Sequence, residues 1–192
     1  MDDLDRARDL VGLGQAMSTL TVGRVSADDV YRAALVQAVS ALDHYFHGVV
    51  IDRAVGMICG RISTTGSESM KVGLSFESVR EIVHALTPVD QEIAARKHAA
   101  SRLARETLQS PDSIASALSF VGVPGIWPLA FNKSAGAWKA TLGTIVTRRN
   151  RIVHQSDGDP LNPGVPTPIT PTDALDAIGS VRTVIATFDP HL

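Results

Sequence analysis

Signals for the start of a helix recur along this chain and constrain its fold more than any other feature. In each, a serine or threonine side chain is placed to accept a backbone N–H of the first helical turn. Three continue with proline at the first helical position, where the missing N–H of proline costs nothing. The starts lie at Ser26, Ser75, Thr87, Ser110 and Thr170. No segment between them alternates apolar and polar residues as a strand does, so the sequence predicts an all-α fold.

The same starts, together with apolar side chains at helical spacing, give the expected helices. Their ranges are 3–19, 27–59, 76–86, 88–108, 111–121, 134–157 and 171–187. The helix over 27–59 is apolar around most of its circumference and is expected to be the central one. Residues 61–73 are rich in Gly, Ser and Thr, and residues 157–171 hold five prolines. Both segments are therefore predicted to be loops.

The length of 192 residues suits one domain with a sizeable core and is short for two. We therefore expect a single domain over 1–192, with its core at about 27–160 and a C-terminal helix after the proline-rich loop. Apolar residues make up 44% of the chain, which is typical of a globular protein. The net charge of −2 gives no general attraction to nucleic acid, so a polyanion would need a local cationic cluster.

Cys59 is the only cysteine, which excludes an intramolecular disulfide and a cysteine-based metal site. Asp43, His44 and His47 stand at helical spacing and offer metal-ligand chemistry. Because no second cluster supplies further ligands, neither a metal nor another cofactor is expected. The N-terminus is acidic, and no apolar run approaches the roughly 18 residues of a membrane span. The sequence thus predicts a cytoplasmic protein without a membrane partner.

The densest cationic cluster lies in residues 148–151, at the start of the stretch RRNRIVHQSD (148–157). Arg149 falls within the apolar sector of the helix predicted over 134–157. A purely structural helix would be expected to carry leucine at this position. Arg148 and Arg151 complete the cluster and are the expected contacts for a polyanionic substrate. The placement of Arg149 indicates a role for its charge.

Asn150 and His154 are four residues apart and share a helix face, and Asp157 lies close to that face. Arg149 projects about 140° away from His154 on an ideal helix. The two side chains can therefore meet at one group only if the helix frays or bulges, or if a second copy of the chain supplies the missing half.

Each of these residues also has a structural interpretation. Arg149 would form a buried ion pair with Asp43 or Asp157. His154 would be a hydrogen-bonded histidine near a helix C-terminus, where a cation complements the helix dipole. Asn150 would be an ordinary surface residue.

The pattern Arg149-Asn150-x-x-x-His154 matches the Arg-(polar)-x-x-x-His signature of the HEPN superfamily of all-helical proteins. Three blocks resemble its RiboL-PSP-type branch. ALDHYFHGVV (41–50) is similar to the first conserved helix of that branch, and FVGVPGIWPLAF (120–131) to its tryptophan-containing approach to the last core helix. RRNRIVHQSD resembles the end of that helix. Together the blocks span about residues 27–160.

The resemblance implies a HEPN-like bundle with a central up-down helix core and accessory helices. It also implies a homodimer that brings two copies of the motif face to face. The activity it implies is metal-independent cleavage of RNA by attack of the ribose 2′-OH on the adjacent phosphate. Such an enzyme would act as a toxin or antiviral effector, with an antitoxin or neighbouring effector protein as a further partner.

The residue types of the motif suit this chemistry. A histidine such as His154 exchanges protons near neutral pH, and the guanidinium of Arg149 binds phosphate oxygens as charge develops. Asn150 would orient the phosphate or a neighbouring side chain. From the resemblance, Asp43 is expected to hold Arg149, and His47 and Asp157 are the other supporting residues.

Two other functions remain open from the sequence. The first is a non-catalytic HEPN homodimer that binds a partner protein or small ligand. The second is an RNA-binding module without turnover, which the modest net charge disfavours.

Overall fold

The computed structural model describes residues 2–18, 26–64, 73–159 and 161–192. The described chain is mainly helical, which confirms the predicted all-α class. Its helices are α1 (Asp2–Met17), α2 (Ala27–Ile58), α3 (Phe76–Val83), α4 (Pro88–Leu103), α5 (Pro111–Phe120), α6 (Ile126–Phe131), α7 (Ala135–Gln155) and α8 (Pro171–Phe188). Short 3₁₀ turns follow α6 and α8, over Asn132–Ser134 and Asp189–His191. Two strands, β1 (Gly158–Asp159) and β2 (Asn162–Pro166), form an antiparallel pair.

All five predicted helix starts are confirmed by the contacts of their capping side chains. Each hydroxyl accepts a backbone N–H from two or three residues further along the chain, at 3.1 or 3.2 Å. At Ser110 and Thr170 the cap is reciprocal, because the side chain of Ser113 or Asp173 accepts the N–H of the capping residue in return. These local hydrogen bonds set the N-terminal ends of α2, α3, α4, α5 and α8.

Residue contacts divide the chain into two compact units. Unit 1 comprises Met1–Leu42 and Lys133–Pro190, and unit 2 comprises Asp43–Asn132 and His191–Leu192. The first part of α2 belongs to unit 1 and the second part to unit 2. The single domain expected from the sequence stays a prediction.

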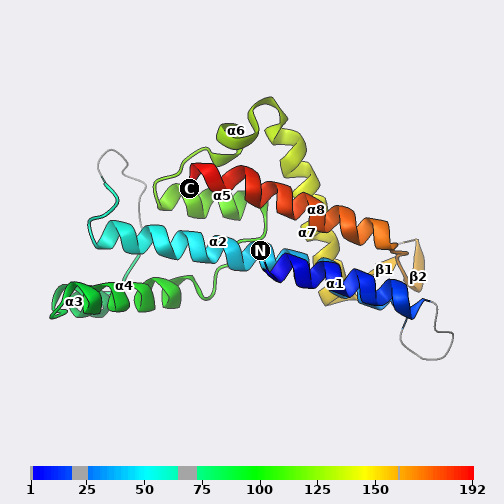
Figure 1. Ribbon diagram of the computed structural model, residues 1–192, viewed down its shortest axis with the longest axis horizontal. Coiled ribbons are helices and arrows are strands. Elements are labelled where there is room, and N and C mark those ends of the chain that lie inside the picture. The colour runs from blue at the N-terminus through cyan, green and yellow to red at the C-terminus, as the bar shows by residue number, and fades with distance from the viewer. Residues whose placement is uncertain (1, 19–25, 65–72, 160) are drawn as a thin grey trace. The chain divides into compact units, whose positions relative to one another are not determined.

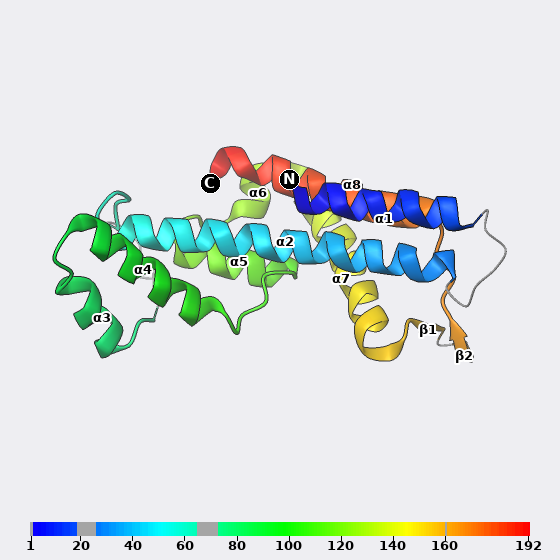
Figure 2. The same ribbon diagram turned by 60° about the horizontal axis from the view of Figure 1, so that its bottom comes forward.

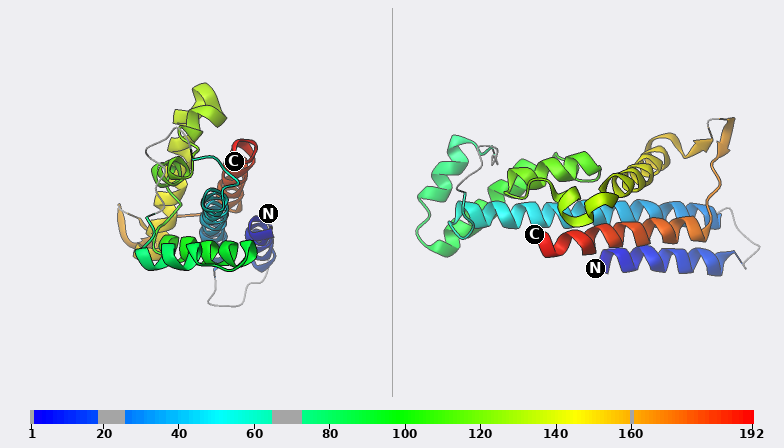
Figure 3. Two further views of the ribbon diagram at one scale, coloured as in Figure 1. Left: turned by 90° about the vertical axis from the view of Figure 1, so that its left-hand side faces the viewer. Right: turned by 90° about the horizontal axis from the view of Figure 1, so that it is seen from above.

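In unit 1, α8 packs against both α1 and α7 (Figure 1). Figure 3 shows α1 and α8 side by side. A Cβ atom on Gly14 of α1 would lie 2.5 Å from the Tyr31 ring, so glycine permits the close approach of α1 to the first part of α2. The core consists of buried apolar side chains from these four helices, among them Leu4, Val11, Leu35, Val39, Leu142, Ile178, Val181 and Phe188.

In unit 2, α3 and α4 form a helical hairpin (Figure 2). Ile82 of α3 and Ala95 of α4 pack with Val55 of α2 in a small hydrophobic cluster. Further along the unit, α5 packs against α6, and the fully buried Trp127 donates from Nε1 to the Pro111 carbonyl at 2.9 Å. These contacts give unit 2 its own buried core.

Several sequence predictions need correction. The segment 157–171, expected to be a loop, contains the β1–β2 pair, whose turn is closed by hydrogen bonds from Asn162 and the Leu161 N–H to the Asp159 carboxylate. Those hydrogen bonds lower the pKa of Asp159. α6 was not predicted; it begins after Gly125, which adopts the left-handed conformation with φ +66°.

Helix ends were predicted less well than starts. α3 ends at Val83 rather than residue 86, and α4 ends at Leu103 rather than residue 108. The Leu108 N–H instead donates to the Asp43 carboxylate, so the segment after α4 is held by a side chain from α2. Residue 19 and most of the predicted loop over 61–73 lie outside the described residues. Among the described helices, none has the length and apolar character needed to cross a bilayer.

Candidate functional site

The motif residues lie in the last two turns of α7, which is one continuous helix from Ala135 to Gln155. The helix neither frays nor bulges between Arg149 and His154, so their side chains leave the axis about 140° apart. One of the two routes by which they could meet is thereby removed. Within a single chain the two side chains point in different directions.

Arg149 is half-buried, and among the described residues its guanidinium forms no ion pair with a carboxylate. Its Nη1 donates to Oδ1 of Asn150 at 3.1 Å, and its Nε is buried without a hydrogen-bond partner in the described part of the chain. The ion pair with Asp157, one of the structural interpretations of this residue, is not formed. Asn150 is exposed and accepts the hydrogen bond from Arg149, and its expected role in orienting the phosphate or a neighbouring side chain stays a prediction.

His154 lies exposed in the last turn of α7. Its ring makes no hydrogen bond with the residues that the structure describes. The structural interpretation, a hydrogen-bonded histidine, therefore finds no support among those residues. An exposed imidazole can exchange a proton with solvent or with a bound ligand.

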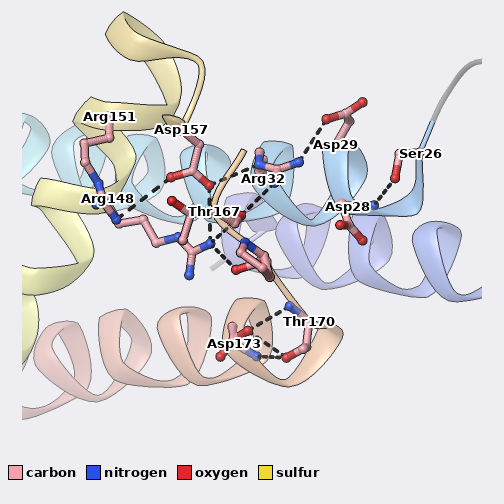
Figure 4. Close-up of polar contacts among 11 residues, drawn as sticks. Ser26, Asp28, Asp29, Arg32, Arg148, Arg151, Asp157, Thr167, Thr170 and Asp173 are labelled. Carbon is pink, nitrogen blue, oxygen red and sulfur yellow. Dashed lines mark hydrogen bonds and ion pairs between the residues drawn. The ribbon is translucent and has the colours of Figure 1, made fainter. Parts of the chain in front are cut away.

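Asp157 follows the end of α7 and is fully buried, with three arginines around it (Figure 4). Its Oδ2 accepts from Arg32 Nε at 3.1 Å and from Arg148 Nη2 at 3.3 Å. Nη2 of Arg151 lies 4.0 Å from Oδ1. We call these four residues the Asp157 cluster. A buried carboxylate is stable only with such partners.

The Asp157 cluster fixes the chain where α7 ends. Ser156 and Asp157 both adopt φ +52°, a left-handed turn that ends the helix. The backbone of Asp157 donates to the Arg151 carbonyl at 3.0 Å and accepts from the Thr167 N–H at 2.7 Å. The turn is thus tied to α7 and to the segment after β2.

Arg148 and Arg151 were predicted to contact substrate, but the structure turns both toward Asp157. Arg148 Nη2 also donates to the Pro168 carbonyl at 2.7 Å, and its side chain is 19% exposed. Arg151 is 32% exposed and keeps more of its surface open to a ligand. Much of the positive charge of the predicted cationic cluster is therefore offset by the buried carboxylate of Asp157.

Arg32 of α2 belongs to the Asp157 cluster and was missed by the sequence analysis. It is buried, and each of its three nitrogens donates: Nε to Asp157, Nη1 to Asp29 at 3.0 Å, and Nη2 to the Thr167 carbonyl at 2.8 Å. The i,i+3 spacing of Asp29 and Arg32 is visible in the sequence, but it does not indicate a partner 125 residues away.

Asp43 and His47, predicted as supporting residues, belong to unit 2 and contact each other and their surroundings there. Asp43 accepts the Leu108 N–H, and His47 Nδ1 lies 2.8 Å from the Asp43 carbonyl oxygen. His47 Nε2 lies 3.3 Å from the Leu103 carbonyl oxygen. These contacts account for both side chains structurally, and their support of Arg149 stays a prediction.

The described residues hold no group of three or more His, Cys, Asp and Glu side chains arranged to bind a metal ion, and Asp43, His44 and His47 do not form one. The candidate site is the exposed or half-buried group Arg149, Asn150 and His154 on α7, next to the Asp157 cluster at the end of this helix. No protein-family model, no curated protein and no solved structure matches this chain.

Proposed function

We propose that this protein is a HEPN-type endoribonuclease that cleaves RNA without a metal ion, through attack of a ribose 2′-OH on the adjacent phosphate. The observation that carries the proposal is the contrast among neighbouring arginines. Arg148 and Arg151 face the carboxylate of Asp157, whereas the described contacts of the Arg149 guanidinium go to the neutral amide of Asn150. A cation without a carboxylate is available for a phosphate.

The two groups divide the chemistry between them. The exposed imidazole of His154 transfers a proton, an effect typically worth about 10²–10⁴ in rate. Arg149 donates to the phosphate oxygens while negative charge develops, an effect of about 10²–10³ for one well-placed donor. Attack by the 2′-OH breaks the bond to the 5′ oxygen of the next nucleotide and leaves a 2′,3′-cyclic phosphate.

A second copy of the chain completes the site. Because the continuous helix keeps Arg149 and His154 about 140° apart, two copies of α7 related by a two-fold axis are needed to bring an arginine and a histidine to one phosphate. The proposal therefore includes a homodimer with two α7 ends facing each other.

The first experiment incubates the purified protein with RNA in the presence of EDTA. We expect fragments that end in 2′,3′-cyclic phosphate. His154→Ala and Arg149→Ala are each expected to lower the cleavage rate by at least about 10². The matched controls are His44→Ala and Arg80→Ala, because both side chains are exposed and lie on other helices. A His154→Ala variant that cleaves at the full rate would remove the catalytic role of this residue.

A mixing experiment tests the composite site directly. Arg149→Ala and His154→Ala proteins are expected to be inactive alone. When subunits exchange at random, about half of the dimers are mixed, and one of their two sites has both groups intact, so activity should return to about a quarter of the wild-type level. No recovery, despite demonstrated subunit exchange, would contradict a site shared between two copies.

The non-catalytic homodimer is the alternative that the same experiments address. A stable dimer that leaves RNA intact in every condition would favour a protein- or ligand-binding module. A monomer would count against both functions.

A further inference from the structure

Unit 1 contains a groove of about 500 Å³ beside the end of α7. Its volume lies within the range of pockets that hold small ligands. The lining residues come from α2, from the last turn of α7 and from the end of β2. They are Asp29, Arg32, Ala33, Val36, Gln37, Ile152, Ser156 and Pro166.

The groove opens on the same face of α7 as Arg149. Arg149 and Ile152 have the i, i+3 spacing of neighbours on one face of α7, and Ile152 lines the groove. Arg149 lies three residues before Ile152, a rise of about 4.5 Å along the axis. A ligand in the groove would therefore have Arg149 within one helical turn.

The lining has two kinds of surface. Ala33, Val36, Ile152 and Pro166 are apolar and come from α2, α7 and β2. Asp29, Gln37 and Ser156 add hydrogen-bonding groups. This pattern fits a flat ligand with apolar faces and polar edges, which describes a nucleobase.

We propose that this groove binds one guanine nucleotide of an RNA strand, with its phosphate directed toward Arg149. The inference rests on the proposed ribonuclease function and names its substrate subsite. The base lies against the apolar side chains, and its edge faces Asp29.

Guanine is favoured because of Asp29. One oxygen of this carboxylate accepts from Arg32 Nη1, and the side chain is still 63% exposed. A carboxylate only accepts hydrogen bonds, and the Watson–Crick edge of guanine presents two adjacent donors, N1–H and the N2 amino group. Uracil presents one N–H between two carbonyl oxygens, which a carboxylate repels. Arg32 is itself held by Asp157 and Thr167, so Asp29 has a fixed partner.

The test measures nucleotide binding without cleavage, by NMR titration or calorimetry with the full-length protein. Guanosine 3′-monophosphate is expected to bind at least about tenfold more tightly than uridine 3′-monophosphate. Asp29→Asn should remove this preference, because the amide replaces one acceptor by a donor. No binding of the guanosine nucleotide, or equal binding of both nucleotides, would overturn the proposal.

A variant that fills the groove provides the second arm. Ala33 is exposed, so Ala33→Trp should fold, which thermal melting verifies, and should weaken guanosine 3′-monophosphate binding at least about tenfold. The matched control is Ala186→Trp, an exposed alanine of α8 that does not line the groove. Unchanged binding by a folded Ala33→Trp protein would overturn the location.

The third arm tests whether the groove binds a nucleotide within an RNA strand or a free nucleotide. A short oligouridylate with one 2′-deoxyguanosine cannot be cleaved after that base and should bind more tightly than guanosine 3′-monophosphate. Weaker binding of the oligonucleotide would overturn the assignment to RNA. Cleavage of RNA without guanosine binding would contradict this inference and leave the ribonuclease function standing. Guanosine binding without cleavage would contradict the ribonuclease function and leave the groove as a guanine-binding site only.

Discussion

The end of α7 and the α3–α4 hairpin differ in which side chains they bury. At the end of α7 the carboxylate of Asp157 is fully buried, and Arg32 is 8% exposed. On the hairpin, Phe76 is 97% exposed and Leu86 is 94% exposed. One region buries charge among hydrogen bonds, and the other leaves large apolar groups in solvent.

The comparison teaches that helical periodicity identifies a stripe of residues but not the direction it faces. Phe76, Val79 and Val83 form an apolar stripe on α3, and Leu86 continues its spacing after the helix ends; all four are exposed, whereas Ile82 beside them is buried. In unit 2, α3 is therefore held by few core contacts. In unit 1, the end of α7 is held mainly by hydrogen bonds to charged groups. The stability of each region should therefore depend strongly on one or two side chains.

The largest expected effect is the loss of the buried carboxylate. Asp157→Ala leaves Arg32 and Arg148 without their shared acceptor, so the free energy of unfolding should fall by about 3–5 kcal/mol. Urea denaturation measures this change. Asp176→Ala, an exposed residue of α8, is the control and should alter stability by less than about 0.5 kcal/mol. A loss below about 1 kcal/mol for Asp157→Ala would show that the cluster adds little stability.

The next largest effect is expected in the hairpin, where substitutions of two neighbouring residues of α3 should change stability by different amounts. Ile82 is 4% exposed and packs in the hydrophobic cluster with Val55 and Ala95, so Ile82→Ala should cost about 2–4 kcal/mol. Val83 is 67% exposed, and Val83→Ala should change stability by less than about 0.5 kcal/mol. Thermal or urea denaturation of both variants gives the comparison. Equal losses would mean that the exposed stripe is covered in solution.

The local signals of the sequence predicted the helix starts, because a capping hydroxyl and the backbone N–H that donates to it lie two or three residues apart. They also placed Arg149, Asn150 and His154 on one helix. The Asp157 cluster could not be predicted in this way, since Arg32 and Asp157 are 125 residues apart and meet only in the folded chain. For the same reason the sequence assigned Arg148 to substrate, although tertiary contacts turn it inward. α6 was missed because it begins at a left-handed glycine rather than at a capping hydroxyl.

A third prediction compares the adjacent arginines of α7. Arg148 donates to Asp157 and to the Pro168 carbonyl, so Arg148→Met should lower the free energy of unfolding by about 1–3 kcal/mol. Arg149 donates to the exposed Asn150, so Arg149→Met should cost under about 1 kcal/mol. Denaturation of both variants measures the difference. A greater loss for Arg149→Met would favour a structural role for this residue and weaken the proposed contact with phosphate.

The smallest effect concerns the ion pairs that join α3 to α4. Hydrogen bonds from Lys97 and then His98 lower the pKa of Glu81 from its usual value of 4.5. A carboxyl whose pKa is lower in the folded state stabilises the protein above the unfolded pKa, and this contribution is lost as the pH falls through the folded value. Glu81→Gln should therefore lower the melting temperature slightly at pH 7.

As the pH falls below 4.5 and then through the lowered pKa of Glu81, the melting temperatures of the wild type and Glu81→Gln should approach each other, because protonation neutralises the Glu81 carboxylate in the wild type as well. Glu77→Gln is the matched control on the same helix, since none of the hydrogen bonds or ion pairs found among the described residues involves Glu77. A difference for Glu81→Gln that persists unchanged into acid would mean that packing, rather than the charge of Glu81, joins the two helices. The hairpin would then depend on its few buried apolar contacts alone, which would sharpen its contrast with the charge-based end of α7.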